Sequence, residues 1–250
     1  MRLTVLGGCG AWPAAGQACS GYLVEHDGFR LLLDPGYAIV PRLLERIDAT
    51  EVDAVLVTHS HPDHCADLHP LLRARVLREA PASALAVHAL PGAVDRVLGL
   101  DGPGTLQDAI TLVEFAAGER FEVGPFQVQT WPLPHSVPNA GVRVATAGRV
   151  LAYTGDTGPS EAIVELASDA DLFLAEASFP QQVPASATRY LSSARQAGED
   201  AARAGVGRLL LTHLLPGTAP GLAEAAARAT FTGAVGVAHG GIVADLGPGP

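Results

Sequence analysis

Short apolar runs, separated by turns that contain glycine, proline or aspartate, recur along most of the chain. Such runs predict β-strands, and those without polar positions predict strands that are buried on both faces. The predicted strands are residues 2–6, 21–26, 30–34, 53–58, 84–88, 121–132 (as strand, turn and strand), 141–147, 149–154, 171–176, 208–212 and 234–238.

Apolar residues at helical spacing lie between many of these strands. The predicted helices are residues 39–47, 63–79, 91–100, 159–167, 192–204 and 219–229. Hairpins dominate the first part of the chain and strand–helix units the last, which predicts an α/β (α+β) fold with helices covering mixed β-sheet. No linker is long or polar enough to divide the chain, so we expect one domain over residues 1–250, with a frayed tail at 247–250.

Composition and charge exclude two classes of protein. The chain is 48% hydrophobic and 17% charged, which excludes intrinsic disorder. The net charge is −10 and all 16 basic residues are arginine, so a broad basic surface for nucleic acid is excluded as well. Arg73, Arg75 and Arg78 form a small basic cluster in the predicted helix 63–79, where we expect a solvated face.

Two features of the sequence bear on location. The N-terminal apolar run is too short for a signal-peptide core, and the long uncharged stretch 123–142 contains four prolines and is no membrane span. The three cysteines, Cys9, Cys19 and Cys65, form no CxxC pair and indicate no disulfide framework. We therefore expect a cytoplasmic protein with no membrane partner.

A dense histidine motif follows the predicted strand 53–58. It reads His59-Ser60-His61-Pro62-Asp63-His64, with the form HxHxDH. A shuffled chain of this composition would contain the pattern roughly once in 1,500 times, so chance explains it poorly. A turn leaving a buried strand can direct alternate side chains at one point, and imidazole and carboxylate groups are ligands that Zn²⁺ prefers. The motif predicts metal ligands; the alternative is a polar turn that caps a helix.

Two metal ions need about seven protein ligands, so three more are required, each at a strand end. His135 follows the predicted strand 121–132, Asp156 follows 149–154, and His213 follows 208–212. Each has an ordinary interpretation when taken alone; Asp156, for example, could simply cap the following helix. Together with the motif they predict two divalent metal ions as the cofactors, and no organic cofactor.

These motifs, in this order, resemble those of the metallo-β-lactamase superfamily. The resemblance implies an αβ/βα four-layer sandwich of two mixed β-sheets with a dinuclear metal site at one edge. It implies that His59, His61 and His135 bind the first metal, that Asp63, His64 and His213 bind the second, and that Asp156 bridges the two. Zinc is the favoured metal, with manganese and iron as alternatives.

Within the superfamily the chain is most similar to the RNase Z-like phosphodiesterases, which include a small bacterial group that hydrolyses cyclic nucleotides. The segments that carry this similarity are 4–7, 33–36, 153–157, 174–178, 190–192 and 201–213. The tRNA-processing members have a basic arm between the positions of His135 and Asp156. Only 20 residues intervene here, so we expect no tRNA substrate.

The resemblance also implies catalytic residues. Asp63 would hold the attacking hydroxide and accept its proton. Relatives commonly have a second catalytic histidine where this chain has Tyr190, so Tyr190, Ser136 or a water molecule is left to assist the leaving group. Asp34 is either a turn residue or a carboxylate that orients a ligand histidine, and Glu176 either orients a neighbour or ends a strand.

The sequence favours a metal-dependent hydrolase, specifically a phosphodiesterase that acts on a small nucleotide-type substrate such as a cyclic nucleotide. One alternative is a lactone or thioester hydrolase with the same metal site. Another is a metal-binding module without enzymatic activity. The apolar positions of the helix after the motif suit either a homodimer interface or the core, so the oligomeric state stays open.

Overall fold

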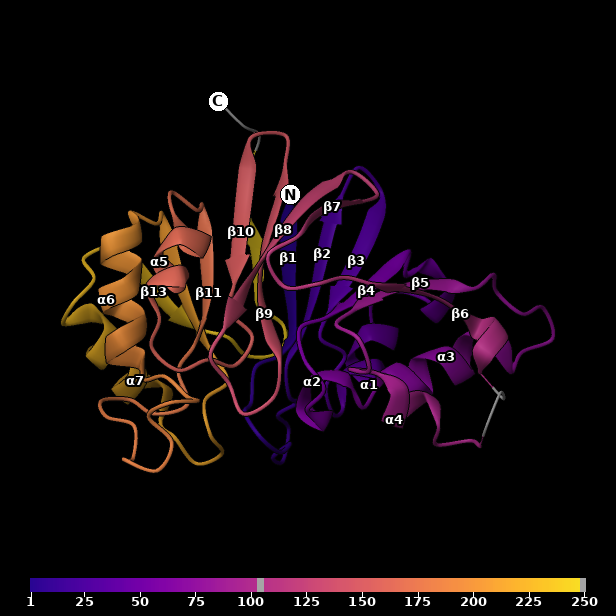
Figure 1. Ribbon diagram of the computed structural model, residues 1–250, viewed down its shortest axis with the longest axis horizontal. Coiled ribbons are helices and arrows are strands. Elements are labelled where there is room, and N and C mark those ends of the chain that lie inside the picture. Colours follow the sequence, from indigo (N-terminus) through magenta and orange to yellow (C-terminus); the bar gives the residue numbers. More distant parts are fainter. Residues whose placement is uncertain (103–105, 248–250) are drawn as a thin grey trace.

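Two seven-stranded β-sheets lie face to face, and helices cover their outer sides (Figure 1). The computed structural model describes residues 1–102 and 106–247. The predicted fold class, with two mixed sheets between helices, is confirmed. The frayed tail expected at 247–250 lies, apart from Gly247, outside the described residues.

The first sheet has the strand order β14-β1-β2-β3-β4-β5-β6. Its strands are β1 Arg2–Gly7, β2 Gly21–His26, β3 Phe29–Leu33, β4 Ala54–Val57, β5 Leu85–Ala89, β6 Ile110–Glu114 and β14 Val243–Asp245. The helical segments of this half are α1 Ile39–Leu44, η1 Ala49–Glu51, α2 Pro62–Cys65, α3 Leu68–Val76, α4 Asp95–Leu98 and η2 Gln107–Ala109.

The second sheet has the order β13-β12-β11-β10-β9-β8-β7. Its strands are β7 Arg120–Val123, β8 Phe126–Leu133, β9 Asn139–Thr146, β10 Arg149–Tyr153, β11 Leu172–Glu176, β12 Arg208–Thr212 and β13 Ala234–Val237. Its helices are α5 Glu161–Ala167, α6 Ala194–Ala204 and α7 Pro220–Arg228. Ser193 caps α6 by accepting a hydrogen bond from the Gln196 amide.

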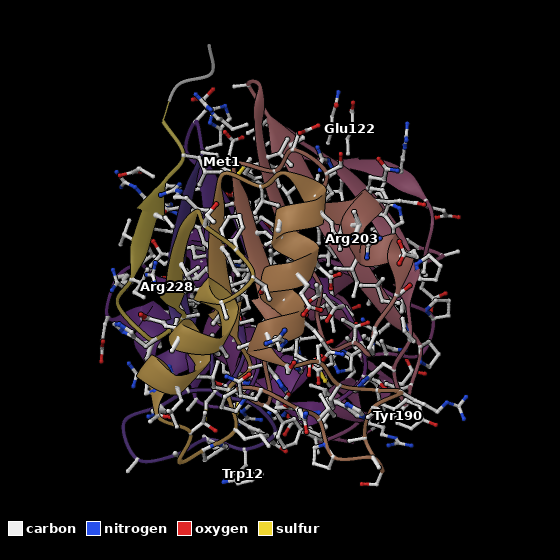
Figure 2. The ribbon with its side chains drawn as sticks, turned by 90° about the vertical axis from the view of Figure 1, so that its left-hand side faces the viewer. Met1, Trp12, Glu122, Tyr190, Arg203 and Arg228 are labelled. Atoms are coloured by element: carbon white, nitrogen blue, oxygen red, sulfur yellow. The ribbon has the colours of Figure 1, made fainter. Side chains whose placement is uncertain are left out.

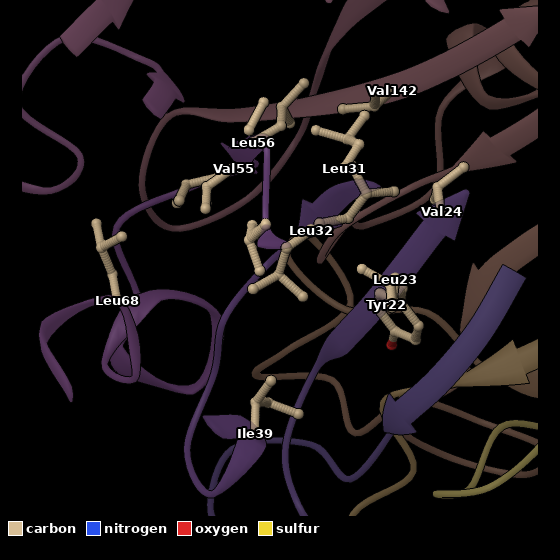
Figure 3. Packing of buried hydrophobic residues seen from close by; sticks show 14 of the residues in the cluster. Tyr22, Leu23, Val24, Leu31, Leu32, Ile39, Val55, Leu56, Leu68 and Val142 are labelled. Carbon is tan, nitrogen blue, oxygen red and sulfur yellow. The ribbon is translucent and has the colours of Figure 1, made fainter. Parts of the chain in front are cut away.

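The main hydrophobic core lies between the inner faces of the two sheets. Leu31 of β3 and Val142 of β9 belong to the same buried cluster, and Figure 3 shows them facing each other. A second cluster, rich in alanine, fills the space between the second sheet and α5 to α7. Close packing requires a small residue here, because a Cβ at Gly198 would lie 2.5 Å from the carbonyl oxygen of Ala227.

The strand directions bring polar residues to one edge of the sandwich. β3, β4 and β5 are parallel, and so are β10, β11 and β12. β8 is antiparallel to β9, which is antiparallel to β10, so β8 and β10 point the same way. Loops at the carboxyl ends of parallel strands share one edge of a sheet, and ligand sites concentrate there. All the strands that precede the predicted ligands end at this edge.

Most of the predicted elements are present, but three predictions need correction. The helix expected at 63–79 is two helices, α2 and α3. The break occurs at Asp67, which bonds to other segments: its backbone amide donates to the Pro35 carbonyl, and its carboxylate accepts from the Val40 amide at 2.8 Å. The helix expected at 91–100 extends only over Asp95–Leu98. The edge strands β6 and β14 were not predicted. Among the described residues, every helix is too short or too polar to cross a bilayer.

Arg75 differs from the solvated arginine that the sequence predicts. It is 4% exposed, and its guanidinium donates to the carbonyls of Ala49 at 2.7 Å, Val52 at 3.0 Å and Ser83 at 3.1 Å. It thus joins α3 to the loop before β4 and to the loop before β5. Arg73 and Arg78 are exposed and pair with Asp101 and Asp48, as expected for a solvated face.

We predict that Arg75→Met lowers the free energy of unfolding by about 2–4 kcal/mol, because three buried carbonyls lose a charged donor. The matched control is Arg73→Met, which removes an exposed ion pair and should change stability by less than about 1 kcal/mol. Denaturant unfolding of the two variants and the wild type measures both effects. An equal loss in the two variants would show that the buried contacts of Arg75 add nothing.

Candidate metal centre

The seven predicted ligands meet at the carboxyl edge of the two sheets. Those from the first sheet lie in the turn after β4 and in α2, and those from the second lie just after β8, β10 and β12. All have less than a tenth of their surface exposed except His61 and His135, which are half-buried, and the side chain of His135 is only 4% exposed. The residues are His59, His61, Asp63, His64, His135, Asp156 and His213.

Their ligand atoms form two groups. In each group the atoms lie within 4.8 Å of one another, which is close enough to share one metal ion. The first group is His59, His61, His135 and Asp156, and the second is Asp63, His64, Asp156 and His213. Asp156 belongs to both groups. The membership is the one that the resemblance implies, and the role of each residue as a ligand stays a prediction.

Three imidazole nitrogens converge in the first group. The Nδ1 atom of His61 lies 3.2 Å from His59 Nε2 and 3.0 Å from His135 Nε2. Burial, together with the charge of nearby histidines, holds the pKa of His59 well below its usual range, and burial also lowers the pKa of His135. The imidazoles are therefore neutral at pH 7, which is the form that binds metal.

The second group combines imidazoles with carboxylates. His213 Nε2 lies 3.1 Å from Asp63 Oδ2 and 3.2 Å from Asp156 Oδ2, and His64 Nε2 lies 3.1 Å from Asp156 Oδ1. Burial alone would raise the pKa of Asp156, but His213 and His64 hold it well below its usual range. The carboxylate is therefore ionised, as a metal ligand must be.

The donor set fits a pair of divalent cations. His64 Nε2 and Asp156 Oδ1 are fully buried, yet neither makes a properly directed hydrogen bond to any described residue. Buried polar atoms are normally satisfied, and a cation between these two would satisfy both. Imidazole nitrogen and carboxylate oxygen suit zinc, manganese and iron.

Hydrogen bonds outside the two groups fix the tautomers of the histidines. Nδ1 of His135 donates to the Tyr190 carbonyl at 2.8 Å. Nδ1 of His213 lies 2.9 Å from the Ser178 hydroxyl, whose own proton goes to Glu176, so here the imidazole is the donor. Nδ1 of His59 lies 3.0 Å from the Thr58 hydroxyl, which donates its own proton to Asp34, so this imidazole is also the donor. In each case Nε2 is left to face the metal site, as in well-characterised metal centres.

Asp34 anchors His64 in the same way. Its buried carboxylate accepts from His64 Nδ1 at 2.8 Å, from the Tyr153 hydroxyl at 2.8 Å, and from both the amide and the hydroxyl of Thr58 at 2.7 Å. It also lies in a turn with a left-handed backbone, φ 49°. Both interpretations of Asp34 left open by the sequence therefore hold.

Glu176 ends β11 and also orients its neighbours. It accepts from the Thr157 amide, next to Asp156, at 2.5 Å, from the Ser178 hydroxyl at 2.7 Å and from the Ser192 amide at 3.2 Å. Burial, reinforced by the charge of Asp156, raises the pKa of Glu176 to about 8. Ser178 and Thr58 were not singled out as site residues, because their roles arise from contacts that no local pattern encodes.

Tyr190 approaches the site through its main chain. Its carbonyl accepts from His135, and its ring lies 5.7 Å from the guanidinium carbon of Arg189. Three other residues of types that bind metal lie outside the two groups: His69 pairs with Asp101 at 3.0 Å, His88 stacks on Phe121, and Cys65 is buried in the core.

We predict that Asp34→Asn lowers metal affinity about 10- to 100-fold, because an amide cannot accept all four hydrogen bonds and His64 loses its orientation. Titration against a chromophoric chelator measures the affinity, and thermal unfolding checks that the variant is folded. Tyr153→Phe is the matched control, since it removes one donor and keeps the carboxylate; its effect should be smaller. Wild-type affinity in folded Asp34→Asn would refute the anchoring role.

Known proteins are similar to this chain in both sequence and fold. The family described as Beta-lactamase superfamily domain matches residues 29–214, a range that contains all seven predicted ligands. The chain is 30% identical over 249 residues to the probable metallo-hydrolase YhfI of Bacillus subtilis (strain 168), covering 97% of this chain and 99% of that protein. It is 32% identical over 246 residues to a ribonuclease Z of Mycobacterium sp. (strain KMS), covering 88% of this chain and 86% of that protein.

The crystal structure of the metallo-beta-lactamase fold protein YhfI from Bacillus subtilis matches with a TM-score of 0.88 at 28% identity, covering 97% of this chain and 98% of that one. The similarity therefore extends over both sheets and the edge that carries the site. The chain belongs to the beta-lactamase superfamily, among metallo-hydrolase and RNase Z-like relatives.

Proposed function

We propose that the protein is a dinuclear metal-dependent hydrolase, and that it acts as a phosphodiesterase on small substrates of the nucleotide type, cyclic nucleotides among them. The observation that carries this proposal is the convergence of seven ligand side chains into two groups that share Asp156. These side chains would hold two divalent cations, with zinc favoured, and the cations would supply a water molecule of lowered pKa and positive charge to neutralise the phosphoryl oxygens.

Asp63 is proposed to hold the attacking water. Its Oδ2 atom accepts from the Ala11 amide at 2.9 Å and lies 3.1 Å from His213 Nε2. Although burial acts in the opposite direction, these histidine contacts hold the pKa of Asp63 well below its usual range. The lowered pKa keeps this carboxylate ionised, so it can accept a hydrogen bond from the attacking water and hold it in place.

Tyr190 is proposed to assist the departing alkoxide by donating its phenolic proton. Support comes from the backbone of Tyr190, which is bound to His135 and so keeps this residue beside the first ligand group.

A small substrate suits the shape and the charge of the chain better than a folded tRNA. The residues between His135 and Asp156 form β9 and β10, which pair with each other and with β8 and leave no protruding arm. The net charge of −10 opposes long-range attraction of a polyanion. A compact phosphodiester needs neither an arm nor a basic surface.

We predict that the metal-loaded protein hydrolyses cyclic AMP and bis-p-nitrophenyl phosphate, and that a chelator abolishes this activity until metal is restored. His61→Ala should lower the activity at least ~100-fold, because one ligand group loses a nitrogen. His69→Ala is the matched control: it lies outside both groups and should keep the activity of the wild type.

The same assay panel includes a homoserine lactone and a thioester. Turnover of either of these without turnover of a phosphodiester would replace the proposed substrate class with attack at carbon. Stoichiometric metal with no turnover of any ester would leave a metal-binding module in place of an enzyme. Full activity in His61→Ala would contradict the metal mechanism itself.

A further inference from the structure

Trp12 lies exposed in the loop between β1 and β2. It is 54% exposed, and it is the single aromatic residue among the exposed large apolar side chains of the described residues. Figure 2 shows Trp12 and Tyr190 at the same end of the molecule, opposite the end that carries Met1 and Glu122. An indole is a large apolar surface to leave in water, and exposed aromatic groups beside a reactive site commonly contact ligands.

The loop that carries Trp12 rests directly on the metal centre. The Ala11 amide donates to the Asp63 carboxylate at 2.9 Å, so Trp12 follows a residue that is bound to a predicted ligand. Gly10 packs on a second ligand, because a Cβ there would lie 2.5 Å from the His213 carbonyl oxygen and 2.7 Å from its Nδ1. Trp12 is therefore within two residues of both contacts.

The backbone of this loop is held in place. The Trp12 amide donates to the Gly10 carbonyl at 2.8 Å, and the Trp12 carbonyl accepts from the Cys9 thiol at 3.5 Å. Ala14 and Gln17 exchange two hydrogen bonds across the tip, at 3.1 and 2.8 Å. Ala11 has a left-handed backbone, φ 63°, which few residues with a side chain adopt. The exposed indole is thus carried on a pre-organised loop, so a ligand loses little by ordering it.

We propose that Trp12 is a specificity-determining residue: its indole stacks on the base of a nucleotide whose phosphate lies at the metal centre. This inference rests on the proposed function, and it assigns the chemical group that the site recognises beyond the phosphate. Stacking does not depend on charge, which suits a chain that has no lysine and a net charge of −10. Every base has a flat face, so this contact favours nucleotides over other phosphodiesters without selecting one base.

The composition of the chain makes this contact directly measurable. Trp12 and Trp131 are its two tryptophans, and Trp131 packs partly buried against the alanine-rich cluster under α5 to α7. In Trp131→Phe, Trp12 is the only indole. We expect AMP to quench its fluorescence saturably in the zinc-loaded protein, and ribose 5-phosphate, which has no base, to leave it unchanged. Trp12→Phe, which keeps only Trp131, is the matched control and should show no quenching by AMP.

Calorimetry with Trp12→Ala measures the contribution to affinity. AMP should bind about tenfold more weakly or worse, which corresponds to the loss of one stacked base, whereas ribose 5-phosphate should bind as it does to the wild type. Equal weakening of both ligands would indicate damage to the metal centre and would overturn the stacking role. The stacking role would also be overturned if AMP did not quench the fluorescence of Trp12, or if AMP bound Trp12→Ala as tightly as it binds the wild type.

These outcomes are separable from those of the activity assay. Hydrolysis of phosphodiesters with no response of Trp12 to AMP would refute stacking and keep the proposed function. Saturable quenching by AMP in a protein that hydrolyses no phosphodiester would refute the proposed function and keep the base contact.

Discussion

The buried carboxylate of Asp34 connects the parts of the chain that build the metal centre. Its donors come from the end of β4, from α2 and, through the Tyr153 hydroxyl, from β10 of the opposite sheet. Buried polar groups are normally hydrogen-bonded, and this carboxyl group keeps its partners only while all three segments hold their relative positions. The positions of three predicted ligands depend on these segments: His59 follows β4, His64 lies in α2 and Asp156 follows β10.

In this site, the residues proposed to bind metal and the residue proposed to recognise the substrate lie on different parts of the fold. The proposed ligands lie just after strands, where outside hydrogen bonds from Thr58, Ser178 and the Tyr190 carbonyl fix the imidazoles. The side chain proposed to recognise the substrate, Trp12, lies on a surface loop that rests on those ligands. Proteins commonly place binding residues on loops positioned by a rigid scaffold, since loops can vary without disturbing the core.

The sequence predicts those features that depend on local pattern. Strand 208–212 matches β12 residue for residue, and the histidine motif locates the site, because both are encoded within a few neighbouring positions. Features that depend on contacts between distant residues cannot be predicted from local sequence pattern. The break between α2 and α3 arises from the bonds of Asp67 to segments about 30 residues earlier, and the burial of Arg75 from carbonyls of two loops. The edge strands β6 and β14 are largely exposed and lack the clear apolar pattern of the interior strands.

In the proposed metal centre, seven side chains bind two metal ions that share one carboxylate. Crystals of zinc-loaded protein, measured at the zinc absorption edge, test it most directly through anomalous difference maps. We predict two peaks bridged by Asp156, one bound by His59, His61 and His135 and the other by Asp63, His64 and His213. A single peak, or peaks bound by other residues, would contradict the claim.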